Sequence, residues 1–148
     1  MNETSVVDYM TTTFPEVETT MAYGYTFFFY RSDRLLPFAT LISSNQEYDR
    51  ISNLDRPGVF RLNIGVSRKT FQSLFSTEKS TEKSTGKVDV SNYDFTTLDV
   101  IMPHPEYAQQ HFICVLSPSE ATFERVGLLL AEAYDMAVRR STSQSKNK

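Results

Sequence analysis

Within the predicted strand at residues 59–66, the alternation of apolar and polar residues from Phe60 onward is the feature that most constrains the fold. The even positions are large and apolar: Phe60, Leu62, Ile64 and Val66. The odd positions between them are Arg61, Asn63 and Gly65. Because successive side chains of a strand point to opposite faces of a sheet, this pattern predicts a strand with one face in a core. Arg61 and Asn63 must then leave that core face together.

Apolar spacing and chain-breaking residues predict the other elements. We expect an N-terminal helix ending before Pro15, strands at 17–23, 25–30, 38–42, 98–102 and 111–116, and a short helix after Ser67. Ser117-Pro-Ser-Glu120 is typical of a helix start and is followed by an amphipathic pattern to about Arg139. The order is helix, three or four strands, helix, two strands, helix. Since strands come in groups, the chain predicts an α+β fold with a mostly antiparallel sheet and helices packed on one face.

The 148 residues suit one domain, which we place at 1–140. A tetrapeptide is repeated three times between Ser76 and Lys87 and contains no apolar residue to bury. We therefore interpret 76–92 as a mobile low-complexity insertion between secondary elements. The Ser/Gln/Lys-rich residues 141–148 predict a disordered tail.

Composition limits the class of protein. The net charge of −3 and the pI near 5.4 exclude a strongly basic nucleic-acid protein. Cys114 is the only cysteine, so an intrachain disulfide and a thiolate cluster are both excluded, which favours the cytoplasm. We find no signal-peptide pattern and no run of about 18 apolar residues, and so expect no membrane partner. No phosphate-binding glycine loop is present, and we expect no cofactor.

Four strings together resemble a bacterial family of small proteins classed only as a domain of unknown function. They are FFFY at 27–30, NLDRPGVFRLNIGV at 53–66, MPHPEY at 102–107 and CVLSPSEATFE at 114–124. That resemblance implies no chemistry. The C-terminal third, a strand followed by Ser-Pro-Ser and a long helix, is also similar to the MmcQ/YjbR-like proteins. This second likeness implies a compact α+β fold with an antiparallel sheet and, by analogy, contact with DNA.

The candidate binding site lies in the one basic segment of the domain, residues 50–69. Arg61 and Asn63 share the polar strand face, and Asn53, Asp55 and Arg56 come just before it. A guanidinium presents forked donors to a carboxylate or phosphate, so these residues predict an anion site. Alternatively, Arg61 pairs with an acid of a neighbouring strand such as Asp99, while Asn53 and Asp55 tie down their own loop. His104 and Tyr107 are further candidate binding residues of a nearby turn.

Three other clusters carry alternatives. One interpretation of His104, Glu106 and His111 is a set of metal ligands. The other is that the two histidines belong to a turn and to a strand edge, and we predict no metal site. Cys114 is a buried inert thiol or a nucleophile, and we predict no catalytic residue. The aromatic run 25–30 belongs to the core or lines a pocket, with Tyr25 and Tyr30 as the pocket candidates.

The function expected from these observations is a binding or interaction module, not an enzyme, whose partner is a small anionic ligand or a protein. One alternative is nucleic-acid binding through residues 50–69 and the basic tail. The other is an enzyme acting on a small anionic substrate, which would need His104 or His111 to converge with Arg61.

Overall fold

In the computed structural model, the described residues are 1–31, 36–75 and 89–146, with side chains described as far as Thr142. The elements are α1 (Glu3–Thr13), β1 (Val17–Ala22), β2 (Tyr25–Tyr30), β3 (Ala39–Ile42), β4 (Arg61–Gly65), α2 (Arg68–Phe75), β5 (Ile101–Pro103), the 3-10 turn η2 (Ala108–Gln110), β6 (Phe112–Leu116) and α3 (Glu120–Lys146). No helix among the described residues is long and apolar enough to cross a membrane.

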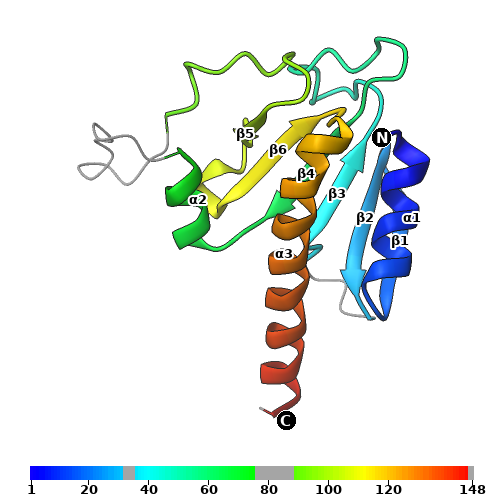
Figure 1. Ribbon diagram of the computed structural model, residues 1–148, viewed down its shortest axis with the longest axis vertical. Coiled ribbons are helices and arrows are strands. Elements are labelled where there is room, and N and C mark those ends of the chain that lie inside the picture. The colour runs from blue at the N-terminus through cyan, green and yellow to red at the C-terminus, as the bar shows by residue number, and fades with distance from the viewer. Residues whose placement is uncertain (32–35, 76–88, 147–148) are drawn as a thin grey trace.

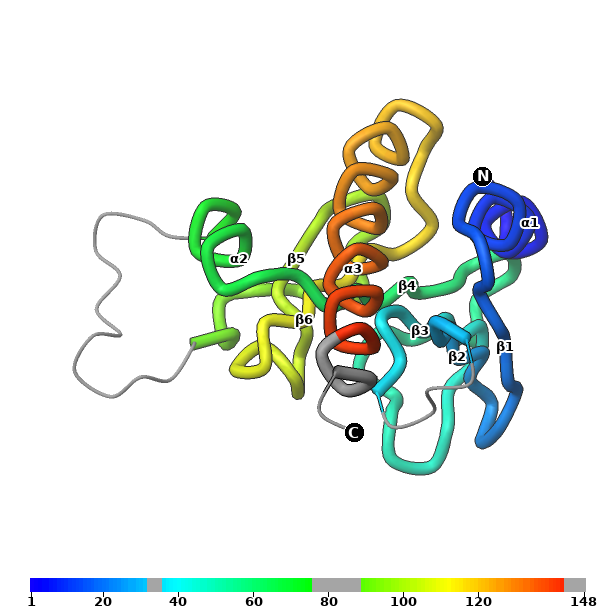
Figure 2. Tube along the Cα trace, turned by 90° about the horizontal axis from the view of Figure 1, so that it is seen from below, coloured from blue at the N-terminus to red at the C-terminus, as the bar shows by residue number. Residues whose placement is uncertain are grey.

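The strands form one sheet in the order β1-β2-β3-β4-β6-β5, and every neighbouring pair is antiparallel. Helices α1 and α3 lie on the same side of this sheet, and α2 packs beside β5 (Figures 1 and 2). The predicted α+β class, the antiparallel sheet and the element order are therefore confirmed.

Both sides of the middle of the sheet are buried. On the helix side, Leu62 and Ile64 of β4 pack in a large core with Val126 and Leu130 of α3. On the other side, loops replace helices: Leu54 of the β3–β4 connection and Phe95 of the segment before β5 pack against the sheet. The alternating pattern of β4 thus places its polar residues in a second, loop-covered interior, not in solvent.

Two element boundaries differ from prediction at the junctions around β5 and α3. β5 begins at Ile101 instead of Leu98, because Asp99 has a φ of 64° and leaves strand geometry. The N-cap of α3 is Ser119 instead of Ser117: its Oγ accepts from the backbone N–H of Thr122 at 3.2 Å. Ser117 instead has a φ of 41°, and its Oγ accepts from the backbone N–H of Phe60.

The predicted end of the last helix and the predicted insertion can also be compared with the structure. α3 extends to Lys146, past the predicted end near Arg139 and into the predicted tail at 141–148. The repeat at 76–87 lies outside the described residues. At the described end of the predicted insertion, Val90 packs against both cores.

The first prediction concerns the contact between α3 and the sheet. Leu130 is 0 % exposed, so Leu130→Ala should lower the free energy of unfolding by about 2–5 kcal/mol through lost burial and an unfilled cavity. Leu128, 74 % exposed on the same helix, is the matched control, and Leu128→Ala should change it by less than about 0.5 kcal/mol. Urea unfolding of both variants measures the difference. Equal losses would show that the buried side of α3 is misassigned.

Candidate functional site

Arg61 occupies the centre of the loop-covered interior. It is 0 % exposed. Its Nη1 donates to Oδ1 of Asp49 at 3.1 Å and to Oγ of Ser52 at 3.1 Å, and its Nη2 donates to Oδ2 of Asp49 at 2.6 Å. Its Nε donates to Oδ1 of Asn63 at 3.0 Å. All three nitrogens of the guanidinium, Nε, Nη1 and Nη2, therefore donate hydrogen bonds to groups of the protein itself.

Asp49 is the counter-ion, and it comes from the long connection between β3 and β4. The hydroxyl of Tyr25 also donates to its Oδ2. Burial works to raise the pKa of Asp49, but the hydrogen bonds from Arg61 and Tyr25 outweigh it and hold that pKa below its usual value. Burial and the bond to Asp49 raise the pKa of Tyr25. The cluster thus consists of an ionised pair and a neutral phenol.

This geometry changes the interpretation of Arg61. The alternative partner predicted from sequence, Asp99, is wrong: its Oδ1 accepts from the backbone N–H of Ser119 at 2.7 Å, at the start of α3. Asn63 is buried beside Arg61, and its Nδ2 donates to Thr40 at 3.0 Å. The position that an external anion would take on Arg61 is filled by the Asp49 carboxylate.

His104 lies near this cluster, whereas His111 does not. The Nδ1 of His104 accepts from the backbone N–H groups of Glu106 and Tyr107, each at 3.0 Å, so it carries no proton. Burial, then the charge of Arg61, lower the pKa of His104 to about 3. The half-exposed Tyr107 ring lies 4.9 Å from the His104 ring. The ring of His111 instead packs against Phe71 of α2 at 5.7 Å.

Burial controls the chemistry of the thiol at Cys114. Cys114 is buried, and burial raises its pKa to about 12. It follows that the thiolate is disfavoured at neutral pH. Within residues 1–31, 36–75 and 89–146, no group of three or more His, Cys, Asp or Glu side chains is arranged to hold a metal ion.

Asn53, Asp55 and Arg56 are separated from Arg61 and organise the loop. Oδ1 of Asp55 accepts from the backbone N–H of Asn45 at 2.9 Å. The Nε of Arg56 donates to the carbonyl of Asn53 at 2.8 Å, while its Nη2 donates to the carbonyls of Ser52 and Thr96. Arg56 thereby joins the β3–β4 connection to the segment before β5.

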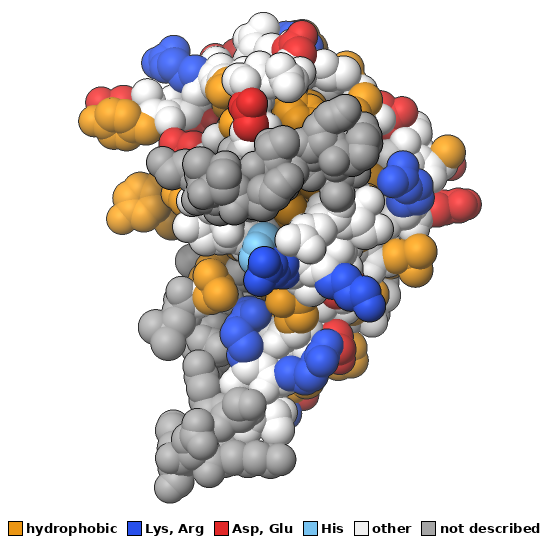
Figure 3. All heavy atoms as spheres, turned by 90° about the vertical axis from the view of Figure 1, so that its left-hand side faces the viewer, with side chains coloured by type: hydrophobic (Ala, Val, Ile, Leu, Met, Phe, Trp, Pro, Cys, Tyr) orange, Lys and Arg blue, Asp and Glu red, His pale blue; other side chains and the backbone are white. Residues whose placement is uncertain are grey.

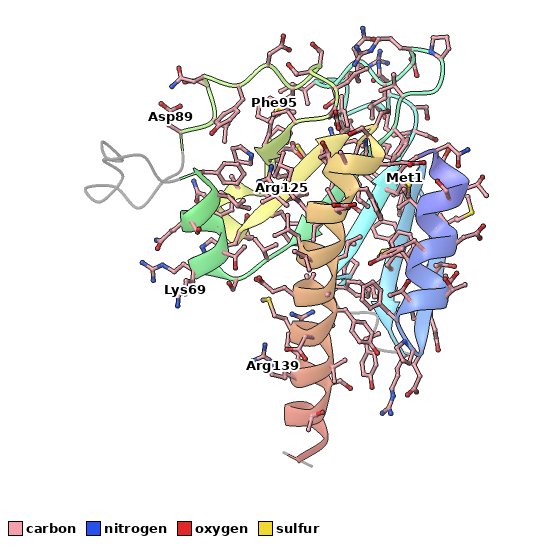
Figure 4. The ribbon with its side chains drawn as sticks, viewed as in Figure 1. Met1, Lys69, Asp89, Phe95, Arg125 and Arg139 are labelled. Atoms are coloured by element: carbon pink, nitrogen blue, oxygen red, sulfur yellow. The ribbon has the colours of Figure 1, made fainter. Side chains whose placement is uncertain are left out.

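Arg56 also lines a cavity of about 410 Å³ that sequence reasoning did not find. The cavity lies between the start of α1 and the segment leading into β4, at the end of the molecule where Met1 is labelled in Figure 4. Its lining residues are Asn2, Glu3, Thr4, Ser43, Arg56, Gly58, Val59 and Phe60. A smaller cavity of about 270 Å³ lies between α2, β5 and α3 and includes Asp99 and Arg125.

A family model covers residues 1–146 and is described as a family of unknown function, DUF6194. The chain belongs to this family. No curated protein and no solved structure matches it. Membership of DUF6194 supports the resemblance to an uncharacterised domain.

Two of the residues that bond Arg61 could not be identified from the sequence alone. Asp49 and Ser52 stand in a polar connection rich in similar residues, and only the need of a buried Arg61 for a counter-charge would have pointed to them. The contribution of α1 to the large cavity likewise depends on how a helix and a distant loop meet in space.

The second prediction tests the buried ion pair. Arg61→Ala leaves Asp49 without its counter-ion and Ser52 and Asn63 without their donor, so it should cost about 3–5 kcal/mol of unfolding free energy. Arg50→Ala removes an exposed arginine of the same connection and should cost less than about 0.5 kcal/mol. Chemical denaturation at neutral pH compares them. Similar costs would mean that the pair contributes nothing specific.

The third prediction concerns the pH dependence of stability. In the unfolded chain His104 takes up a proton below its ordinary pKa of 6.5, but in the folded state it resists protonation down to about 3. The contribution of His104 to the free energy of unfolding is therefore fully present above pH 6.5. It is lost as the pH falls toward 3, by at most about 1.4 kcal/mol per pH unit. His104→Asn, which keeps an acceptor for the two backbone N–H groups, should flatten this slope between about pH 6 and pH 5.

Thermal or urea unfolding at several pH values measures the slope. His111→Asn is the matched control, and it should retain most of the slope because His111 is less buried than His104. If His111→Asn flattened the slope as much as His104→Asn, the depressed pKa of His104 would not be its cause.

Proposed function

We propose that this domain is a binding module without a reaction of its own, and that the cavity beside α1 takes a small anionic ligand. The observation that carries the proposal is the lining of that cavity by Arg56 together with the first turn of α1. Arg56 thereby takes the role that the sequence assigned to Arg61. Arg61 supports the loop that presents Arg56 through its bonds to Asp49 and Ser52, and Asn63 in turn accepts from Arg61.

Part of the Arg56 guanidinium has no hydrogen-bond acceptor among the described residues. Its Nε and Nη2 are bonded to carbonyl oxygens, which fix the direction of the side chain. Across the described part of the chain, no acceptor bonds its Nη1. A guanidinium held in place on one side and open on the other is suited to a carboxylate or phosphate oxygen.

The first turn of α1 adds to this positive potential. Asn2 caps the helix by accepting from the backbone N–H of Ser5 at 2.8 Å, and the carbonyl of Asn2 accepts from Val6. The N–H groups of Glu3 and Thr4 have no partner within the described residues. Unpaired amides at a helix N-terminus, with the helix dipole, favour an anion. The Glu3 carboxylate, which also lines the cavity, favours a ligand that carries a hydrogen-bond donor beside its anionic group.

The side chains that an enzyme would use do not favour the catalytic alternative. The pKa values of Tyr25, His104 and Cys114 are all shifted away from neutrality, so none of the three exchanges a proton readily near pH 7. The free Cys114 supports the further proposal of a reducing, cytoplasmic setting.

The fourth prediction is that inorganic phosphate or a small hydroxy-dicarboxylate raises the melting temperature of the wild-type domain through this cavity. Arg56→Gln keeps an amide that can donate to the loop carbonyls but removes the charge, so it should weaken binding at least about tenfold. Calorimetric titration of wild type and variant measures the change.

Arg125→Gln is the matched control because Arg125 lines the smaller cavity near α2 and should leave binding unchanged. Absence of any ligand effect, or equal weakening by Arg125→Gln and Arg56→Gln, would overturn the proposed site.

Nucleic-acid binding is a second candidate, favoured by one observation. Lys and Arg side chains gather on the side of the molecule shown in Figure 3, and Lys69 of α2 and Arg139 of α3 both project toward that side in Figure 4. The likeness to MmcQ/YjbR-like proteins belongs to this candidate. Binding of an oligonucleotide that falls steeply with salt, and that Lys69→Glu weakens but Arg56→Gln does not, would favour it over the small ligand.

A further inference from the structure

Residues 46–51 of the connection between β3 and β4 form a flap over the loop-covered interior. The flap is closed at its base, because Oδ1 of Asn45 accepts from the backbone N–H of Leu54 at 2.8 Å. Above the base, Gln46 and Asp49 exchange two backbone hydrogen bonds, each 3.1 Å long. Short loops whose ends are joined in this way behave as compact units, so the flap can move as one piece.

Polar contacts hold the flap to the sheet. Its two largest apolar side chains, Tyr48 and Ile51, are 86 % and 51 % exposed, and within the described residues no flap residue belongs to either core. Among the described residues, Asp49 is the one flap residue that bonds a strand of the sheet, through Arg61 and Tyr25. Separation of this carboxylate from its donors therefore frees the flap and leaves both cores packed.

The residues that follow the flap are fixed independently of it. Arg56 donates to the carbonyls of Ser52 and Asn53 at 2.9 and 2.8 Å. Leu54 packs in the second core. Ser52 therefore keeps its place beside Arg61 when the flap moves, and the opening is confined to residues 46–51.

The place that the Asp49 carboxylate occupies is a complete receptor for a carboxylate. Nη1 of Arg61 donates to Oδ1 of Asp49, while Nη2 of Arg61 and the hydroxyl of Tyr25 both donate to Oδ2. A forked guanidinium recognises the planar carboxylate group through two parallel bonds. An external carboxylate that replaces Asp49 gains the same bonds, and the displaced Asp49 is hydrated in solvent.

Stability alone does not account for a flap held in this way. A buried ion pair is often no more stabilising than apolar side chains of similar size, because the cost of desolvating two charges offsets their attraction. The flap carries Tyr48 and Ile51, which are large enough to anchor it in the second core, but both are exposed. A contact made by one carboxylate closes the site and also allows a competing carboxylate to open it.

Aromatic side chains beside this place indicate what else the ligand carries. Tyr25 and Phe27 lie on the loop side of β2 with their ring centroids 5.8 Å apart, and both are half-buried. Phe27 pairs with Thr40 of β3, and Thr40 in turn accepts from Asn63 beside Arg61. A ring attached to the carboxylate can therefore pack against β2 while the charge reaches β4.

We propose that the domain binds a small aromatic carboxylate on Arg61, and that the flap competes with this ligand by placing the Asp49 carboxylate in the same position. In the closed arrangement Asp49 fills the site. In the open arrangement the ligand fills it and Asp49 lies in solvent. This inference does not rest on the cavity that Arg56 lines.

The fifth prediction uses phenylacetate as the probe and phenylacetamide, its neutral counterpart, as the control ligand. Calorimetric titration of the wild-type domain should show saturable binding of phenylacetate and none of phenylacetamide, because only the carboxylate matches the fork of Arg61. Asp49→Asn removes the internal competitor, so it should tighten the binding of phenylacetate at least about tenfold.

Glu47→Gln is the matched control variant. Glu47 is an exposed acid of the same flap, and among the described residues it makes no bond to Arg61. Its replacement should leave the affinity for phenylacetate within about twofold of the wild type. Circular dichroism confirms that the variants are folded. If Asp49→Asn does not fold, Phe27→Leu locates the ligand instead, since loss of the ring should weaken wild-type binding about threefold or more.

A wild-type domain that does not bind phenylacetate would overturn the proposal, even if Asp49→Asn bound it, because Asp49 would then be a permanent part of the fold. Equal affinities of the wild type and Asp49→Asn, equal tightening by Glu47→Gln, or, where Phe27→Leu is used, no loss of affinity would also overturn it, because the ligand would then lie elsewhere.

Discussion

The buried ion pair between Arg61 and Asp49 determines how one whole side of the sheet is built. A guanidinium in an interior must be paired and hydrogen-bonded, because an isolated buried charge is very costly. Asp49, Ser52 and Asn63 satisfy it, and two of these come from the connection between β3 and β4. That connection therefore folds down over the sheet, carrying Leu54 into the second core and Arg56 to the rim of the large cavity.

The parts of the fold that a sequence pattern can predict are those that depend on local periodicity. The alternation in β4, the apolar spacing of α3 and the grouping of strands predict the α+β class and the antiparallel sheet, because each pattern shows which apolar side chains share one face of an element. The predicted end of α3 near Arg139 was wrong, since the basic and Ser-rich residues beyond it still continue the helix. The cap of α3 was misplaced by two residues because Ser117 and Ser119 are equally good caps in isolation.

The candidate site was only partly predictable for a related reason. Polarity singled out Arg56, Arg61 and Asn63, but a pattern cannot say whether the polar side of a strand faces water or a loop that covers it. The sequence therefore left two alternatives, an Arg61 open to a ligand or an Arg61 paired with an acid of a neighbouring strand. The structure buries Arg61 and leaves Arg56, which seemed secondary in the sequence, beside the larger cavity.

The two covers of the sheet differ in how they are held, and this has a consequence for motion. The helix side is joined by broad apolar packing along α3. The loop side is joined by a smaller apolar core and by the polar bonds that Arg61 makes to Asp49 and Ser52. Local opening of such a unit needs less free energy than unfolding the whole domain. We therefore expect the amide hydrogens of residues 43–60 to exchange with solvent sooner than those in the middle of α3, even while the sheet remains folded.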